Sequence, residues 1–173
     1  MARTVSARGR VPLDPSGALA LWTDVERWPS FVEGFARVLE RDPQWPEEGA
    51  RVVWESGAGG RGRVTERVVE HRDDRFATEV FEERLSGTQR FAVTPDGGGT
   101  RAELSLEYEL TSGAPLRAVA DLLFIRRALR DALARTLRRY GVEAEDDAGL
   151  REQDPDAGRQ AHSWPDSQPA KED

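Results

Sequence analysis

Hydrophobic and polar residues alternate most clearly between Arg101 and Leu110. The apolar positions are Ala102, Leu104, Leu106, Tyr108 and Leu110, and they are separated by Glu103, Ser105, Glu107 and Glu109. A period of two predicts a β-strand with two different faces, one packed against a core and the other in water. The segment therefore indicates an antiparallel sheet with one buried face.

Six further strands are predicted upstream, where apolar stretches lie between turn sequences. We expect them at residues 4–13, 35–41, 51–55, 62–72, 76–85 and 88–94. The sequence Pro95-Asp96-Gly97-Gly98-Gly99 is a strong hairpin signal before the last strand. Ser86-Gly87 is expected to form the tight turn between the two strands that precede this hairpin.

Two short helices are expected after the first strand. Asp14 is a suitable N-cap and Pro15 fits the first helical position. An apolar face continues to Val25, and Trp28-Pro29 is expected to end this helix, because proline disfavours helical backbone in the residue before it. A second short helix is expected over residues 31–34.

One long helix is predicted after all the strands, from about Ala114 to Tyr140, with its cap at Ser112 or Gly113. Its apolar residues recur at three- and four-residue steps, at Leu116, Val119, Leu122, Leu123, Leu129, Leu133, Leu137 and Tyr140. At 1.5 Å per residue the helix is roughly 40 Å long, which is enough to cross a sheet. Gly141 is expected to end it.

The negative charge of the chain lies in its C-terminal segment. From Glu143 onward apolar residues are sparse, and ten acidic residues face three basic ones, which gives −7, the net charge of the whole chain. We therefore expect a folded, neutral domain over 1–142 and a disordered acidic tail over 143–173. A neutral domain gives no electrostatic case for nucleic-acid binding. The long helix carries seven arginines and two aspartates, so transient contact with a membrane surface is one interpretation beside an ordinary solvated face.

Other features of the composition exclude several classes of protein. The chain has no cysteine, which excludes disulfides and thiolate-metal sites. No apolar run approaches the ~20 residues of a transmembrane segment, and the N-terminus lacks the apolar stretch of a secretion signal, so we expect a cytoplasmic location. We expect no cofactor and no metal, since His71, the only histidine before the tail, lies near a turn without convergent ligands.

The order of these elements resembles that of the START-like superfamily, in particular the polyketide cyclase/dehydrase and lipid-transport group, also called SRPBCC. The resemblance covers about residues 3 to 141 and is carried by Asp24-Val25-Glu26-Arg27-Trp28-Pro29, Val53-Trp54-Glu55-Ser56, Gly62-Arg63-Val64-Thr65-Glu66 and the arginine-rich final helix. It implies an α+β helix-grip (Bet v 1-like) fold, in which a curved antiparallel sheet of about seven strands wraps around the long C-terminal helix. It also implies a cavity for a hydrophobic or amphipathic molecule, although fold alone does not give function.

The inward faces of the strands and of the final helix predict the walls of such a cavity. The apolar candidates are Trp54, Val80, Phe91, Val93, Leu104 and Leu106, with Leu122, Leu123 and Leu129 on the helix above them. Trp28 and Phe31 are candidates for the cavity mouth, and the alternative is that Trp28 packs the helix corner against the sheet. Trp54 is equally compatible with core packing and with a place on the cavity wall.

Four polar residues are candidates for contact with a ligand or for proton transfer. Glu66 and Glu82 alternate in register with apolar residues of their strands. Burial would raise the pKa of either carboxyl and make it an acid or a base, but we expect both to be solvated, because glutamates are rarely fully buried. Tyr108 is the best polar candidate, since its hydroxyl lies on an apolar face and needs a partner or a ligand. Gln89 is the fourth.

Three hypotheses of function follow. The leading one is non-catalytic binding or transport of a hydrophobic or aromatic small molecule, such as a lipid, a quinone or a polyketide-like compound, between the sheet and the final helix. The second is an enzyme of the polyketide cyclase/aromatase type, which needs a cluster of inward polar residues. The third is an interaction module with a closed interior and no ligand, which a cavity below the usual ~300 Å³ of binding pockets would favour.

Overall fold

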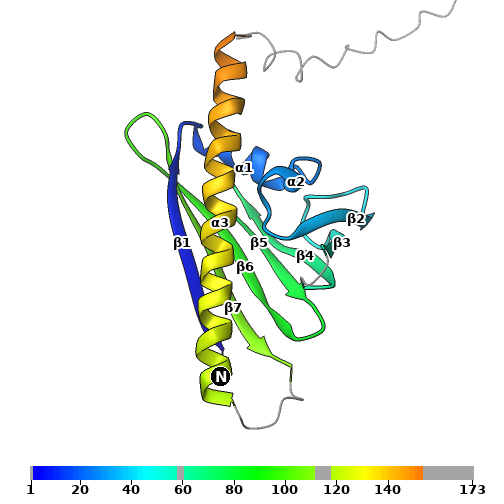
Figure 1. The fold of residues 1–173 in the computed structure, drawn as a ribbon. Helices are drawn as coiled ribbons and strands as arrows, with labels where there is room; N and C mark the ends of the chain where they lie inside the picture. The colour runs from blue at the N-terminus through cyan, green and yellow to red at the C-terminus, as the bar shows by residue number, and fades with distance from the viewer. Residues whose placement is uncertain (1, 58–60, 112–117, 154–173) are drawn as a thin grey trace, which may run out of the picture.

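The fold is a seven-stranded antiparallel sheet that lies against one long helix (Figure 1). The computed structural model describes residues 2–57, 61–111 and 118–153, with side chains described for all of these except 118–123 and 151–153. The elements are β1 (Arg3–Val11), α1 (Pro15–Thr23), α2 (Trp28–Phe31), β2 (Phe35–Arg41), β3 (Arg51–Ser56), β4 (Arg63–Arg72), β5 (Arg75–Phe81), β6 (Leu85–Pro95), β7 (Thr100–Leu110) and α3 (Ala118–Gln153).

The strands follow the order β1-β7-β6-β5-β4-β3-β2, and each pairs antiparallel with its neighbour. Five hairpins arise from consecutive strands, and β1 is added beside β7 at the end of the series. In Figure 1, α3 runs along the sheet in front of β1 and β7, while α1 and α2 cover the adjoining end. This arrangement confirms the helix-grip fold expected from the sequence.

The helical corner differs from the prediction in the position of α2. Asp14 caps α1 as expected, with its Oδ1 accepting a hydrogen bond of 2.9 Å from the Gly17 N–H. The second helix begins at Trp28 rather than after it, and Pro29 lies in its first turn. A proline is accommodated there because the first N–H groups of a helix have no intrahelical acceptor. Trp28-Pro29 therefore starts α2 and does not end α1, which ends at Thr23.

The predicted turn at Ser86-Gly87 is wrong. The chain turns between Phe81 and Leu85, where the Glu82 N–H donates to the Leu85 carbonyl at 2.9 Å, and Ser86-Gly87 lies inside β6. A Cβ atom on Gly87 would lie 2.2 Å from the carbonyl oxygen of Glu107. Gly87 thus permits the close approach of β6 and β7. In a sequence, a glycine needed for this purpose cannot be distinguished from a glycine needed for a turn.

The helix α3 also differs from the prediction at its C-terminal end. It passes through Gly141 and continues to Gln153, and Ala144 is fully buried. Glycine inside a helix costs only about 1 kcal/mol relative to alanine, so contacts made beyond it decide whether the helix continues. The expected disorder is therefore wrong for 143–153, and residues 154–173 lie outside the described part, as do the predicted cap and the first turn at 112–117.

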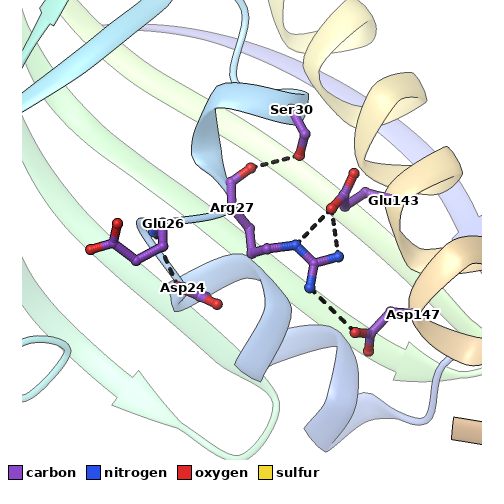
Figure 2. A network of polar contacts seen from close by, with 6 residues as sticks. All are labelled: Asp24, Glu26, Arg27, Ser30, Glu143 and Asp147. Carbon is purple, nitrogen blue, oxygen red and sulfur yellow. Dashed lines mark hydrogen bonds and ion pairs between the residues drawn. The ribbon is translucent and has the colours of Figure 1, made fainter. Parts of the chain in front are cut away.

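Two groups of ion pairs hold the C-terminal half of α3 to the α1–α2 corner. Figure 2 shows Arg27, just before α2, between two carboxylates of α3, with distances of 2.5 Å to Glu143 and 3.5 Å to Asp147. Glu33 likewise pairs with Arg135 and Arg139 at 2.9 Å each. The side chains of Arg27 and of the three carboxylates are partly buried, so their charges are screened less than those of fully exposed pairs.

An aromatic cluster fills the interior beneath this half of α3. The rings of Trp22 and Phe91 stack with centroids 4.3 Å apart, and Phe31 and Tyr140 extend the cluster through stacked and edge-on contacts. The Tyr140 hydroxyl donates to the Ala18 carbonyl at 2.6 Å. Burial, and then the charge of Asp147 in α3, raise the pKa of Tyr140. This end of the sheet–helix space is solid core.

Candidate functional site

A small, partly open cavity lies between the sheet and α3, next to the aromatic cluster. Its volume is about 60 Å³. Seven of the predicted residues line it, namely Trp28, Trp54, Glu66, Gln89, Leu104, Leu106 and Leu129. The remaining wall comes from Trp22, Val32, Glu33, Arg61, Ala132, Leu133 and Thr136. The cavity is thus bounded by the helical corner, by β3, β4, β6 and β7, and by the middle of α3.

The alternation of side chains along the strands determines which residues form the sheet side of this wall. In β7 every second residue is buried, so Leu104 and Leu106 face α3. In β4 the same alternation brings Val64, Glu66 and Val68 to the inner face. The expected face assignments are therefore confirmed for both strands.

Glu66 is buried in the wall of the cavity, with an exposed fraction of 4%. Its Oε1 accepts a hydrogen bond of 3.0 Å from Trp54 Nε1, and its Oε2 accepts one of 2.8 Å from Thr78 Oγ1. Burial raises the pKa of Glu66, while these two hydrogen bonds and the charge of Arg61 act in the opposite direction. The expectation that this carboxyl is solvated is wrong, because two neighbouring side chains supply the hydrogen bonds that water would supply.

Glu82 lies outside β5, beyond its last residue Phe81, and does not line the cavity. Its carboxylate pairs with Arg61 Nε at 2.5 Å. Arg61 does line the cavity, and its guanidinium carbon lies 6.0 Å from the centre of the Trp54 ring. The sequence placed Glu82 within a strand because the turn was expected at Ser86-Gly87. In the structure β5 ends at Phe81, so Glu82 lies in the turn.

Arg61 is the functional candidate that the sequence did not reveal. It follows a glycine-rich stretch whose sequence predicts only a connection between two strands. Its Nη2 atom is buried and has no hydrogen-bond partner among the described residues. No local pattern predicts that a loop arginine folds back over a cavity, because its direction is set by the ion pair with Glu82, which lies 21 residues later in the chain.

Tyr108 lies on the same inner row of the sheet as Glu66. The pairing runs from Glu66 to Val80, then to Gly87 and to Tyr108, so about 14 Å separate the two ends at the usual strand spacing. Tyr108 is fully buried, and its hydroxyl has no partner within the described part of the chain. It does not line the 60 Å³ cavity.

Four other predicted wall residues belong to the packed interior. Phe31 and Phe91 are in the aromatic cluster, and Val80 and Val93 are buried in the core without lining the cavity. The side chains of Leu122 and Leu123 lie outside the described residues. Trp28 packs the helix corner against Phe35 and Trp45 and also lines the cavity, while its expected place at the cavity mouth stays a prediction.

Burial of the apolar face of α3 decreases toward its N-terminal half. Tyr140, Leu137 and Leu133 are buried, whereas Leu129 and Ile125 are only partly buried. Phe124 is 74% exposed. Less apolar surface is therefore packed against the sheet where α3 passes the cavity and continues beyond it.

The described part of the chain offers neither a metal site nor a membrane-spanning helix. It contains no group of three or more histidine, aspartate or glutamate residues placed to hold a metal ion. None of its helices is long and apolar enough to cross a membrane.

The fold is similar to several solved structures at low sequence identity. The protein TTHA0849 from Thermus thermophilus is 19% identical with a TM-score of 0.68, and the match covers 84% of this chain and 99% of that one. The Zhui aromatase/cyclase from Streptomyces sp. R1128 is 14% identical with a TM-score of 0.66, with coverages of 90% and 98%. The di-domain aromatase/cyclase StfQ of the steffimycin biosynthetic pathway is 16% identical with a TM-score of 0.70. That match covers 86% of this chain, which spans about half (52%) of StfQ.

Sequence comparison identifies the family. No functionally curated protein matches the chain. The model of the family described as polyketide cyclase / dehydrase and lipid transport matches residues 2–145, which include every strand and most of α3. The chain therefore belongs to the polyketide cyclase/dehydrase and lipid-transport family of SRPBCC proteins.

Proposed function

We propose that the protein binds a small hydrophobic or aromatic molecule between the sheet and α3, in and beside the cavity that Glu66 lines. The observation that carries the proposal is the buried carboxyl of Glu66 in an otherwise largely apolar wall. Titratable groups with perturbed pKa values in cavities are a physical marker of binding and active sites. Binding without chemistry is the function that these groups support best.

Core packing alone does not explain why a glutamate occupies position 66. A carboxyl removed from water loses solvation, and hydrogen bonds recover only part of it. A valine or leucine at this inward position, like Val64 and Val68 beside it, would serve the core better. The orientation imposed by Trp54 and Thr78 keeps the carboxyl at the cavity, where it is available to a ligand.

The space must enlarge to admit a ligand. About 60 Å³ holds roughly two water molecules at ~30 Å³ each, whereas ligand pockets typically measure ~300 Å³ or more. A displacement of α3 at Leu129 and Ile125, which are only partly buried, exposes less packed apolar surface than a displacement elsewhere along the described part of the helix. The ionic contacts of Arg27 and Glu33 keep the C-terminal half of the helix in place during such a displacement.

The small volume also supports a second candidate, an interaction module with a closed interior. In that case Glu66 is a purely structural group, and no small molecule occupies the interior. A catalytic role of the cyclase/aromatase type draws on the names of two similar structures. It would rest on Glu66 and Gln89, the only two of the four predicted polar residues that line the cavity.

Native mass spectrometry of gently purified protein, followed by extraction and identification of any bound molecule, tests the proposal. We expect a non-covalent adduct with an apolar compound. The matched sample is Leu106→Trp, which adds bulk to the cavity wall and should carry no adduct. An adduct-free wild-type protein that also gains none after incubation with a lipid extract would support the closed module instead.

A further inference from the structure

A groove runs along the free edge of β1, between this strand and the side of α3. We call it the β1–α3 groove, and its volume is about 720 Å³. Its apolar part comes from Ala134, Leu137, Gly141 and Val142 of α3, and Val142 is 57% exposed. The groove shares no lining residue with the cavity at Glu66, so it is a separate surface feature.

The two edges of the sheet differ in their protection against further strands. β2, at one edge, has two register shifts against β3, and such bulges hinder the addition of another strand. β1, at the other edge, pairs with β7 in unbroken register from Arg3 to Val11. A long, regular edge strand offers its free N–H and C=O groups to other chains unless something covers it. A cover is therefore expected along β1, and the groove has room for an extended segment.

The charges of the groove and of the chain beyond α3 are complementary. Four arginines and two acidic residues line the groove, which gives +2. The two arginines of β1 are already paired, whereas Arg130 and Arg138 of α3 form no ion pair with any described residue. Residues 154–173 carry five acidic and two basic side chains, which gives −3. Because both belong to one chain, their effective concentration is on the order of millimolar, and a weak attraction is sufficient for contact.

The residues that follow α3 are numerous enough to return along the groove. Gln153, the last residue of α3, lies eleven residues after Val142, which is ~17 Å along the helix axis. Trp164, the only large apolar residue in 154–173, follows Gln153 by another eleven residues, an extended reach of up to ~36 Å. The sequence Asp154-Pro155-Asp156-Ala157-Gly158 lies between them and is rich in turn-forming residues. It favours a reversal of the chain directly after the helix.

The spacing around Trp164 matches the spacing of residues on α3. In an extended segment Trp164 and Asp166 point to the same side and are ~6.6 Å apart, and Pro165 between them is compatible with extended backbone. On α3, Val142 and Arg138 are neighbours on one face, ~6 Å apart along the axis. A segment antiparallel to α3 with its indole over Val142 therefore brings the carboxylate of Asp166 to Arg138.

We propose that residues 154–173 fold back over the β1–α3 groove of the same chain, antiparallel to α3, with Trp164 on Val142 and Asp166 paired with Arg138. This inference goes beyond the proposed function, because it concerns another surface and requires no small molecule. The contact covers the free edge of β1 and the exposed side chain of Val142.

Paramagnetic relaxation in the full-length protein tests the contact. The chain has no cysteine, so Ser167→Cys provides a single attachment point for a nitroxide label beside Asp166. Amide signals are compared between the oxidised and the reduced label in nitrogen-15-labelled protein. We expect loss of intensity at Ala7, Gly9 and Val142, which line the groove, and none at Val38 of β2 on the opposite edge of the sheet.

A charge swap tests the individual ion pair in the labelled protein. Arg138→Glu should lower the ratio of docked to free segments by about fivefold, and the loss of signal in the groove should decrease accordingly. Adding Asp166→Arg to this variant should restore the loss. Arg63→Glu is the matched control, because Arg63 is exposed on the outer face of β4, and it should leave the effect unchanged.

Three results would overturn the inference. The first is unchanged signal intensity in the groove of the labelled protein. The second is an equal effect of Arg138→Glu and Arg63→Glu, or no restoration by Asp166→Arg. The third comes from a mixture of nitroxide-labelled chains without nitrogen-15 and unlabelled nitrogen-15 chains. Loss of the groove signals in this mixture would show that the segment of a second copy occupies the groove, whereas full intensity supports contact within one chain.

Discussion

Trp54 of β3 and Glu66 of β4 are diagonal neighbours on the inner face of the sheet, and the indole N–H of Trp54 donates a hydrogen bond of 3.0 Å to Glu66 Oε1. Thr78 completes the arrangement from β5. Three adjacent strands thus fix one carboxyl on the inner face of the sheet. With both oxygens engaged, the carboxyl is held in a defined orientation at the cavity and does not turn toward solvent.

The first prediction concerns the pH dependence of stability caused by Glu66. A carboxyl whose pKa is raised in the folded state binds its proton more tightly there than in the unfolded chain. Its contribution is therefore fully present below its usual pKa of 4.5, and it is lost as pH rises through the raised folded value, by at most ~1.4 kcal/mol per pH unit. Glu66→Gln does not titrate, so the free energy of unfolding of the variant relative to wild type should increase over this window.

Urea unfolding of both proteins between about pH 4.5 and 8 measures this difference. Gln retains an oxygen that accepts from Trp54 and an amide that donates to the Thr78 hydroxyl, so packing is preserved. Parallel stability profiles for the two proteins over the whole range would show that Glu66 ionises normally and is not held in a low-dielectric site.

The second prediction tests the location of the ligand. Leu106→Trp adds a large ring to the cavity wall and should weaken binding of acetophenone, a small aromatic probe, by at least about tenfold, because an occupied cavity offers no contact surface to the probe. Val69→Trp is the matched control, since Val69 is 40% exposed on β4 and outside the cavity. Circular dichroism confirms that each variant is folded. Equal affinities in a folded Leu106→Trp protein and in wild type would place the ligand elsewhere.

The third prediction concerns the contact between Arg27 and α3. Arg27→Met leaves Glu143 and Asp147 without their cation in a partly buried setting, where their side chains are 19% and 17% exposed. We expect a loss of about 1–2 kcal/mol in the free energy of unfolding, measured in urea at low salt. Arg37→Met is the comparison, because this side chain is 70% exposed and pairs with Glu55, and it should change stability by less than about 0.5 kcal/mol. Similar losses in the two variants would refute the special role of Arg27.

The fourth prediction separates two positions for the end of the folded domain. A chain that ends at Gln153 keeps every contact described for α3, whereas a chain that ends at Val142 loses the buried Ala144 and both carboxylates bound to Arg27. The shorter chain should be less stable by about 2 kcal/mol or more, which thermal unfolding detects as a lower midpoint. Identical midpoints would restore the boundary at residue 142 expected from the sequence.

Strand positions were predictable from the sequence wherever the period of two was unbroken. The alternation from Ala102 to Tyr108 identified the inner face of β7, and the alternation around Glu66 identified that of β4. The signal failed at Gly87, because a glycine required by close strand approach looks the same as one required by a turn. Similarly, Gly141 resembled a helix end, since the contacts that continue α3 come from Arg27, more than a hundred residues earlier.

The candidate site was predictable only in its apolar part. Leu104, Leu106 and Trp54 follow from strand alternation. Burial of Glu66 does not follow, because average residue preferences favour exposure and only tertiary contacts with Trp54 and Thr78 reverse them. The contribution of Arg61 depends on a long-range ion pair with Glu82, which no local pattern encodes.

The most direct measurement of the central claim is a set of NMR distance contacts between a bound probe and the protein. Leucine methyl groups are labelled with carbon-13, and filtered nuclear Overhauser spectra are recorded with acetophenone in excess. We predict contacts from the probe to the methyl groups of Leu104, Leu106 and Leu129, which line the cavity between the sheet and α3. Contacts confined to other leucines, or none despite saturating probe, would contradict ligand binding at this site.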